Sequence, residues 1–269
     1  MTEPLTHQIV DPLALTSTER ARFTDELYRA HDRIFAGVDR ATFAAYVVDS
    51  PAARTRIQVF RSGEQIVGYA AFHAFESTAG GRPALVLRAE VGLLPEYRRG
   101  TRMGWFLARE CIHCILRSPG RSVYGLSCAT NPATYRTLAK HTDQVWPHWQ
   151  QPTPDDVQQL MTELAEQFQL RSVDDDRPGV YHVGWQTRQS EDEALGWKNC
   201  QHPASRLYID RNPDYAEGQG LLVLVPLTRL GLVRTCMRLI ETKLRRRFGL
   251  RRRLGLTPAM TPMQQLENG

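Results

Sequence analysis

Residues 94 to 104, LPEYRRGTRMG, form a basic turn with two glycines between two predicted elements. The residues before it, PALVLRAEVGL, are predicted as a strand, and those after it, WFLARECIHCIL, as a helix. Free backbone N–H groups and the helix dipole converge where such a turn opens a helix, so the unit can bind an anion. A solvated basic turn without a ligand is the alternative.

The elements around this turn constrain the fold further. Residues 15 to 142 are predicted as helix, helix, three strands, helix, strand and helix. The first helix covers TERARFTDELYRAHDRIF, with Ser17 or Thr18 as its cap. Ser62-Gly63 is predicted to join RTRIQVFRS and QIVGYAAFHAFE in a hairpin. Pro132 stands at the favoured first position of the helix PATYRTLAKH.

Residues 143 to 226 give a weaker pattern. PDDVQQLMTELAEQFQL is predicted as a helix capped by Thr153, with its apolar residues on one face. VYHVGW and RLYID are predicted as short strands on either side of a polar stretch. GLLVLVPL is predicted as a buried strand.

Composition indicates an ordinary soluble globular protein of one large domain or two small ones. The chain has 269 residues, of which 42% are hydrophobic and 23% charged. Its longest apolar run, LLVLVPL, falls short of the roughly 18 residues of a membrane span. MTEPLTHQIV lacks the regions of a signal peptide, and five scattered cysteines favour a reducing compartment. We therefore expect a cytoplasmic protein, with a peripheral location at the inner face of a membrane as the alternative.

The positive charge is concentrated near the carboxyl terminus. Residues 227 to 256 hold ten basic residues and one acid, a net charge of +9. The whole chain has a net charge of +5, so the remaining residues together carry −4. Any partner that this charge attracts therefore belongs to that segment.

The same segment has an apolar stripe at helical spacing and is predicted as a basic amphipathic helix, followed by a disordered tail at 257 to 269. Three interpretations stay open for residues 228 to 256. The helix docks on its own domain, or it binds an anionic membrane surface or an acidic protein. Nucleic acid is disfavoured, because no aromatic interleaving or recognition motif accompanies the arginines.

PEYRRGTRMG, and NPATY after the next strand, resemble the GNAT acyltransferase superfamily. The resemblance is clearest over residues 55 to 142 and extends the predicted domain to residues 1 to 226. It implies an α/β fold with a mixed, mostly antiparallel sheet flanked by helices. It also implies transfer of an acyl group from acyl-coenzyme A to an amine of a small molecule or polypeptide, without a metal.

The turn departs from the superfamily pattern R/Q-x-x-G-x-G/A at Arg102, which replaces the first glycine of the pair. Glycine suits that position because the backbone approaches a pyrophosphate closely. An arginine narrows the approach, although its guanidinium can bind a phosphate itself. The alternative donor is therefore a long-chain acyl-coenzyme A or an acyl carrier protein, with an acceptor at a membrane surface. A non-catalytic adaptor is the further alternative.

The resemblance implies roles for individual residues. Glu90, in the strand before the turn, matches the general base of some members; an exposed cross-strand pair is the alternative. Asn131 matches the asparagine near the pantetheine arm, or is simply a helix cap. Tyr135 is the candidate general acid, although it lies closer to the helix start than usual and can instead pack under the sheet. The donor-binding residues implied are Leu93, Leu94, Arg98, Arg99, Gly100, Thr101, Arg102, Met103, Gly104 and Asn131.

Other reactive residues receive structural interpretations. Cys111, His113 and Cys114 offer three potential ligands within one amphipathic helix, whereas structural zinc normally takes four. We interpret the two cysteines as core residues. His73, in a predicted strand, is interpreted as a structural histidine, with a role as base as the alternative.

Overall fold

The computed structural model describes residues 5–98, 103–142, 144–231 and 234. Residues 99–102 of the basic turn lie outside this set, as do most of the predicted basic helix and the whole predicted tail. What the sequence predicts for those segments stays a prediction. Among the described residues, no helix is both long enough and apolar enough to cross a membrane.

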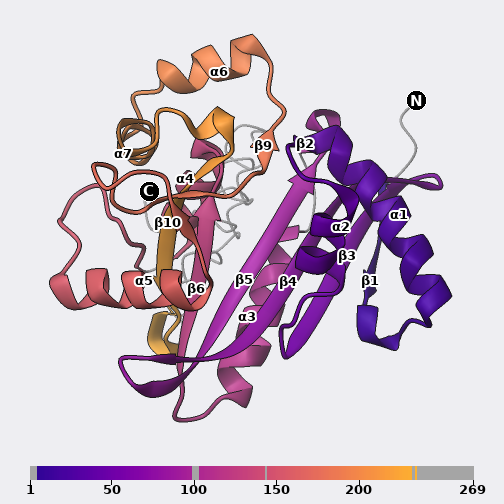
Figure 1. Ribbon diagram of the computed structural model, residues 1–269, viewed down its shortest axis with the longest axis horizontal. Helices are drawn as coiled ribbons and strands as arrows, with labels where there is room; N and C mark the ends of the chain where they lie inside the picture. The colour runs from indigo at the N-terminus through magenta and orange to yellow at the C-terminus, as the bar shows by residue number, and fades with distance from the viewer. Residues whose placement is uncertain (1–4, 99–102, 143, 232–233, 235–269) are drawn as a thin grey trace, which may run out of the picture.

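A mixed sheet of eight strands runs through the molecule (Figure 1). Neighbouring strands are antiparallel except β5 and β6, which are parallel. This confirms the predicted fold class. In spatial order the strands are β1 (Leu5–Val10), β3 (Arg54–Ser62), β4 (Gln65–Ala79), β5 (Arg82–Leu93), β6 (Ser122–Ala129), β10 (Gln219–Pro226), β8 (Val180–His182) and β7 (Arg171–Ser172). A separate two-stranded ladder joins β2 (Phe35–Ala36) to β9 (Gln186–Thr187).

Helices cover both faces of the sheet (Figure 1). The face that we call the α1/α5 face carries α1 (Ser17–Ile34), α2 (Arg40–Phe43), the π-helical turn η2 (Ala44–Val48) and α5 (Asp155–Gln167). The opposite face, the α3 face, carries α3 (Met103–Arg117), α4 (Pro132–His141) and α7 (Pro203–Arg211). The remaining elements are α6 (Glu191–Lys198) and three short 3-10 turns, η1 (Pro12–Ala14), η3 (Pro95–Tyr97) and η4 (Tyr215–Glu217).

Strand alternation builds a core on each face. In β5, Val86 packs in the cluster that contains Leu164 of α5, whereas Leu85 and Leu87 pack in the cluster that contains Phe106 of α3. Because successive side chains of a strand point to opposite faces, this assigns the even-numbered residues of β5 to the α1/α5 face. Burial of apolar side chains on both faces makes β5 a central strand of the sheet.

The parallel pair separates part-way along its length. β5 and β6 pair only from Ala84↔Ser122 to Leu87↔Gly125. β5 continues to Leu93 beside β4 alone, and β6 continues to Ala129 beside β10 alone. The carboxyl ends of the two strands therefore lean apart, as Figure 1 shows. Two parallel strands that end beside each other, each followed by a helix, leave a gap of the kind where ligands bind in α/β sheets.

Local signals set most of the element boundaries. Thr16 caps α1, and its side chain forms a capping box with Glu19. The predicted caps, Ser17 and Thr18, were therefore one or two residues late. The turn between β4 and β5 has positive φ at both Gly80 and Gly81, a conformation that residues with a Cβ rarely adopt.

Two short predictions are corrected. RLYID was predicted as a strand, but residues 206 to 210 belong to α7. Pro203 at the start of α7 and buried Tyr208 on its inner side favour the helix, and the β-branched Ile209 does not outweigh them. In VYHVGW only β8 is a strand. No residue of the edge strand β1 is buried, and no strand was predicted for it.

Candidate active site

Four polar side chains lie together on the α1/α5 face beside the gap. Thr55 of β3 is opposite His73 of β4, which is opposite Arg88 of β5. Glu90 follows Arg88 by two residues, so it points to the same face. Both residues lie beyond Leu87, the last residue of β5 that pairs with β6. The sheet register thus places Glu90, His73 and Arg88 next to one another where β5 and β6 separate.

His73 connects Thr55 to Glu90. Its Nδ1 lies 2.9 Å from the Thr55 hydroxyl, and its Nε2 lies 3.0 Å from Glu90 Oε2. Neither Nε2 nor Oε2 has an aligned hydrogen bond, so the two atoms lie close together without one. The His73 side chain is 1% exposed and that of Glu90 is 10% exposed. Glu90 is therefore not the exposed pair considered as the alternative, and its carboxylate has no committed hydrogen-bond donor at Oε2.

Arg88 is the neighbouring cation, and it is 9% exposed. Its Nη2 donates to the hydroxyl of Tyr46, which comes from the π-helical turn η2. The guanidinium carbon lies 5.2 Å from the centre of the Tyr46 ring and 4.9 Å from that of Phe168. Cation–π contacts of this geometry hold the guanidinium in a fixed position.

Across the gap, Cys128 of β6 faces the same side of the sheet, because it packs with Leu126 in the α5 cluster. Burial raises the pKa of its thiol to about 11. The thiol is therefore protonated near neutral pH, and a thiolate is the form that acts as a nucleophile. Cys128 lines the site without being a candidate nucleophile.

A second buried polar pair lies one register step from Glu90. Tyr69 is opposite Gly92, and its hydroxyl lies 2.9 Å from Nδ1 of His31 in α1. The His31 ring packs 4.5 Å from Phe43 and 4.6 Å from Trp185, measured between ring centres. Burial lowers the pKa of His31 to about 4, so the ring is neutral at pH 7. The pair is thus surrounded by the aromatic rings of Phe43 and Trp185.

The backbone at the end of β5 points into the gap. Leu94 N–H donates to Val67 O at 3.0 Å, so this pair is hydrogen-bonded. In an antiparallel ladder hydrogen-bonded and non-hydrogen-bonded pairs alternate, so Leu93, opposite Gly68, is in a non-hydrogen-bonded pair. Its N–H therefore points away from β4, toward the side from which β6 has separated. Of the two leucines predicted to contact the donor, Leu93 has the better-placed N–H.

Three other predicted donor residues border the same end of the gap. Arg98 donates to Glu193 of α6 at 2.7 Å and approaches Leu93 O at 3.5 Å. Met103 and Gly104 begin α3, and a Cβ at Gly104 would meet no atom within 4 Å. Packing within the described structure therefore does not require a glycine at position 104.

The start of α4 contributes Asn131 and Tyr135. Asn131 caps the helix: its Oδ1 accepts from Thr134 N–H at 2.9 Å, and its Nδ2 donates to the Thr187 hydroxyl at 3.4 Å. Tyr135 is fully buried and donates to Pro147 O at 2.6 Å. The predicted role of Tyr135 as general acid stays a prediction, and its surroundings show a tyrosine packed under the sheet.

Residues 183–199 were not recognised from the sequence as part of the site. This bridging segment pairs with β2 through Phe35↔Thr187, and Arg188 N–H donates to Ile34 O at 3.0 Å. It also contacts the two sides of the gap, where Asn131 donates to Thr187 and Arg98 donates to Glu193. It therefore connects the ends of β5 and β6 across the gap. The sequence signal for a packed segment is the tryptophan at position 185, which is buried.

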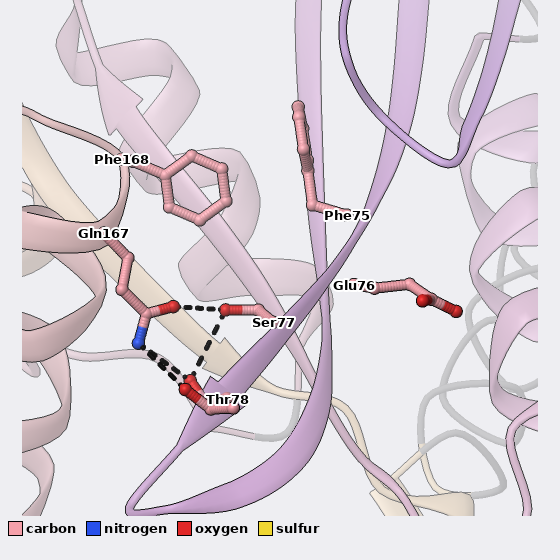
Figure 2. Close-up of a pocket in the computed structure, with 6 residues that line it drawn as sticks. All are labelled: Phe75, Glu76, Ser77, Thr78, Gln167 and Phe168. Carbon is pink, nitrogen blue, oxygen red and sulfur yellow. Dashed lines mark hydrogen bonds between the residues drawn. The ribbon is translucent and has the colours of Figure 1, made fainter.

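A shallow cavity of about 330 Å³ lies nearer the β4–β5 turn, between β4 and the end of α5 (Figure 2). Its polar groups bond to one another: Gln167 accepts from the Ser77 hydroxyl and donates to Thr78 O at 3.1 Å. Figure 2 shows this amide bridging from α5 to the strand. The polar groups of this cavity thus hold α5 against β4. The charged groups beside the β5–β6 gap are therefore the stronger candidate site.

Within the described residues, no group of three or more His, Cys, Asp or Glu side chains could hold a metal ion. Cys111 is partly buried and Cys114 is buried in the α3 core cluster. Burial raises the pKa of Cys111 to about 12. Both are thus packed as apolar side chains, as predicted for core cysteines.

Comparisons with known proteins return no matching family model and no matching curated protein. Solved structures do match. An acetyltransferase from Thermus thermophilus has 14% identity and a TM-score of 0.34, over 52% of this chain and 87% of that one. NAA60 from Arabidopsis thaliana in complex with acetyl-CoA has 17% identity and a TM-score of 0.35, over 51% and 84%. A GCN5-related N-acetyltransferase from Kribbella flavida has 22% identity and a TM-score of 0.33, over 50% and 33%.

The Kribbella flavida structure bears the name of the superfamily that residues 94–104 resemble. At such identities and TM-scores the likeness carries no argument about the activity of this chain. We therefore infer the function from the chain's own strand order, its diverging parallel pair and the groups beside the gap.

Proposed function

We propose that this protein is a GNAT-like acyltransferase that moves an acyl group from acyl-coenzyme A to an amine. The position of Glu90 is the observation that carries the proposal. Its carboxylate is largely buried, contacts His73, and lies on β5 just where β5 and β6 separate. A buried carboxylate next to a histidine in such a gap is a typical general-base arrangement.

Glu90 takes the proton that the acceptor must lose. An amine is mostly protonated at neutral pH, and only its free form attacks a carbonyl carbon. Glu90 accepts one proton from the ammonium group, directly or through a water, and later releases it to solvent. The free amine then attacks the carbonyl carbon. As the C–N bond forms and the C–S bond of the thioester breaks, the nitrogen loses its second proton, which passes to the departing thiolate. His73 keeps the carboxylate in position from β4.

The donor would lie at the carboxyl ends of β5 and β6. Leu93 N–H, directed into the gap, would polarise the thioester carbonyl. Arg98 and the start of α3 at Met103 and Gly104 would bind the phosphates, together with residues 99–102. Asn131, at the start of α4, would contact the pantetheine arm. Gly104 fits this role, because a Cβ there would occupy open space next to the helix start.

A thermal-shift titration with coenzyme A, acetyl-coenzyme A and a long-chain acyl-coenzyme A tests the proposal. A donor at 100 times its dissociation constant stabilises the folded state by about 2.7 kcal/mol, which is easily measured. We expect a saturable shift that Arg98→Glu removes, and acyl transfer to a primary amine that Glu90→Gln removes. Absence of any shift with all three compounds would overturn the proposed donor.

A further inference from the structure

Arg88 is the only arginine among the described residues whose side chain is buried. The arginines of β3, which lies two strands away, all have carboxylate partners: Arg54 pairs with Glu110 at 2.8 Å, Arg56 with Asp11 at 3.1 Å and Arg61 with Glu26 at 2.8 Å. No carboxylate of the described residues lies within 4 Å of the Arg88 guanidinium, although it is the least exposed of the four.

Glu90 acts on the charge of Arg88 through space, but its carboxylate approaches His73 and does not pair with Arg88 within 4 Å. A buried charge without a direct counter-ion is less stable than a directly paired one. The Tyr46 hydroxyl is a neutral partner and uses one of the five N–H donors of the guanidinium. The planar fork of an arginine matches a carboxylate, which can accept two parallel hydrogen bonds from it. Arg88 therefore has the properties of an unfilled carboxylate receptor.

The guanidinium is also held ready for a ligand. Tyr46 and Phe168 both place their rings against it, with centroids 5.2 Å and 4.9 Å from its central carbon. Ordering a long, flexible side chain costs conformational entropy, and this cost has been met before any ligand arrives. The two aromatic rings thus fix the guanidinium more firmly than solvent would fix an exposed arginine side chain.

Glu90 provides the opposite charge at a suitable distance. It follows Arg88 by two residues on the same face of β5, which separates the Cα atoms by about 7 Å. One small molecule can contact both side chains across such a separation. A cation and an anion next to each other are complementary to a ligand that carries a carboxylate close to an ammonium group.

We propose that the acceptor amine is a free α-amino acid, whose carboxylate binds Arg88 while its amino group faces Glu90. This inference rests on the proposed function, because it uses Glu90 as the group that takes the amine proton. Arg88 then selects the acceptor and orients its amine toward the thioester carbonyl. Amines without a carboxylate leave the buried guanidinium unpaired, so the site discriminates against them.

The first test uses the unaltered protein and needs no activity. Isothermal titration calorimetry with the twenty free α-amino acids identifies the best ligand; its α-carboxamide and its decarboxylated amine are then titrated. We expect both analogues to bind at least about 100-fold more weakly, the discrimination typical of a site left with an unpaired buried polar group. Equal binding of the three compounds, or no binding of any amino acid, would overturn the inference.

The second test measures acylation of the same three compounds with acetyl-coenzyme A. Arg88→Gln should reduce the preference for the amino acid over its decarboxylated amine by about 100-fold, and Arg88→Lys should restore part of it. Arg121→Gln, which removes an exposed arginine paired with Glu76, is the matched control and should keep the preference. A preference that survives Arg88→Gln would also overturn the inference.

The two tests separate this inference from the proposed function. Acylation of all three compounds at equal rates would leave the acyltransferase intact and remove the amino-acid acceptor. Selective binding of the amino acid without any acylation would retain the receptor at Arg88 and remove the acyltransferase.

Discussion

Nε2 of His73 lies 3.0 Å from Oε2 of Glu90, although the two residues belong to neighbouring strands and are seventeen positions apart in the chain. The β4–β5 ladder places His73 opposite Arg88 and Glu90 opposite Ala71, one register step along the same face. The contact is thus a product of the ladder, and it joins a buried imidazole to the carboxylate that we propose as the base.

Replacing Glu90 by glutamine should abolish turnover and spare donor binding. The amide keeps the shape of the carboxylate but does not accept the amine proton, and general-base catalysis typically contributes between about 10² and 10⁴ in rate. We expect kcat to fall by at least about 100-fold, with an unchanged thermal shift by acetyl-coenzyme A. Glu76→Gln, an exposed glutamate of β4, is the matched control. Normal turnover in Glu90→Gln would remove Glu90 as the base.

Replacing His73 by phenylalanine should lower kcat with little change in the donor KM. The ring remains, but the contacts with Thr55 Oγ1 and Glu90 Oε2 are lost, so the carboxylate is less well positioned. We expect kcat to fall by about 10-fold. His73→Gln should recover part of it, because an amide N–H can still contact the carboxylate. A merely structural role predicts equal kcat for the two variants at equal stability.

The buried His31 should make stability depend on pH. Burial lowers the pKa of the folded state to about 4, against about 6.5 for an unfolded chain. The unfolded state therefore binds more protons between these values, and His31 contributes full stability only above pH 6.5. As pH falls toward 4 this contribution is lost, by about 2 kcal/mol between pH 7 and pH 5.

Urea unfolding of the protein and of His31→Gln at both pH values measures this contribution. Glutamine does not titrate but can still bond to the Tyr69 hydroxyl, so its loss of unfolding free energy on acidification should be smaller by about 2 kcal/mol. Replacement of the exposed His7 by glutamine is the control and should leave the pH dependence unchanged. Equal pH dependence of the protein and His31→Gln would contradict the assignment.

The sequence predicted the fold where periodicity is local. The strand before residue 94, the helix after it and the hairpin at Ser62-Gly63 all follow from residues close to one another. Glu90 could be predicted as a site residue because it lies on the central strand of that unit. Its surroundings could not be predicted. The contact with His73 depends on sheet register, and the position of Arg88 depends on Tyr46 from a distant π-helical turn. Register is set by the packing of whole strands.

Gly92 and Gly104 are expected to be glycines for different reasons. At Gly92 the reason is packing against the end of α1. A Cβ at Gly92 would lie 2.7 Å from Phe35 Cε2 and 3.2 Å from Ile34 Cγ2, so β5 approaches the end of α1 too closely for a side chain. Overpacking of this kind costs about 1 to 3 kcal/mol. We expect Gly92→Ala to lower the free energy of unfolding in urea by that amount. An unchanged unfolding midpoint would contradict the close contact.

Gly104 should behave in the opposite way, because a Cβ there meets no atom within 4 Å. Alanine favours the helical conformation over glycine by up to about 1 kcal/mol, so Gly104→Ala should maintain or raise the stability of the protein. If the donor's phosphates approach the backbone at the start of α3, the added methyl group blocks that approach. We then expect a smaller thermal shift with acetyl-coenzyme A at each concentration, in a protein that is at least as stable without it. Unchanged donor affinity in Gly104→Ala would move the phosphates away from this turn.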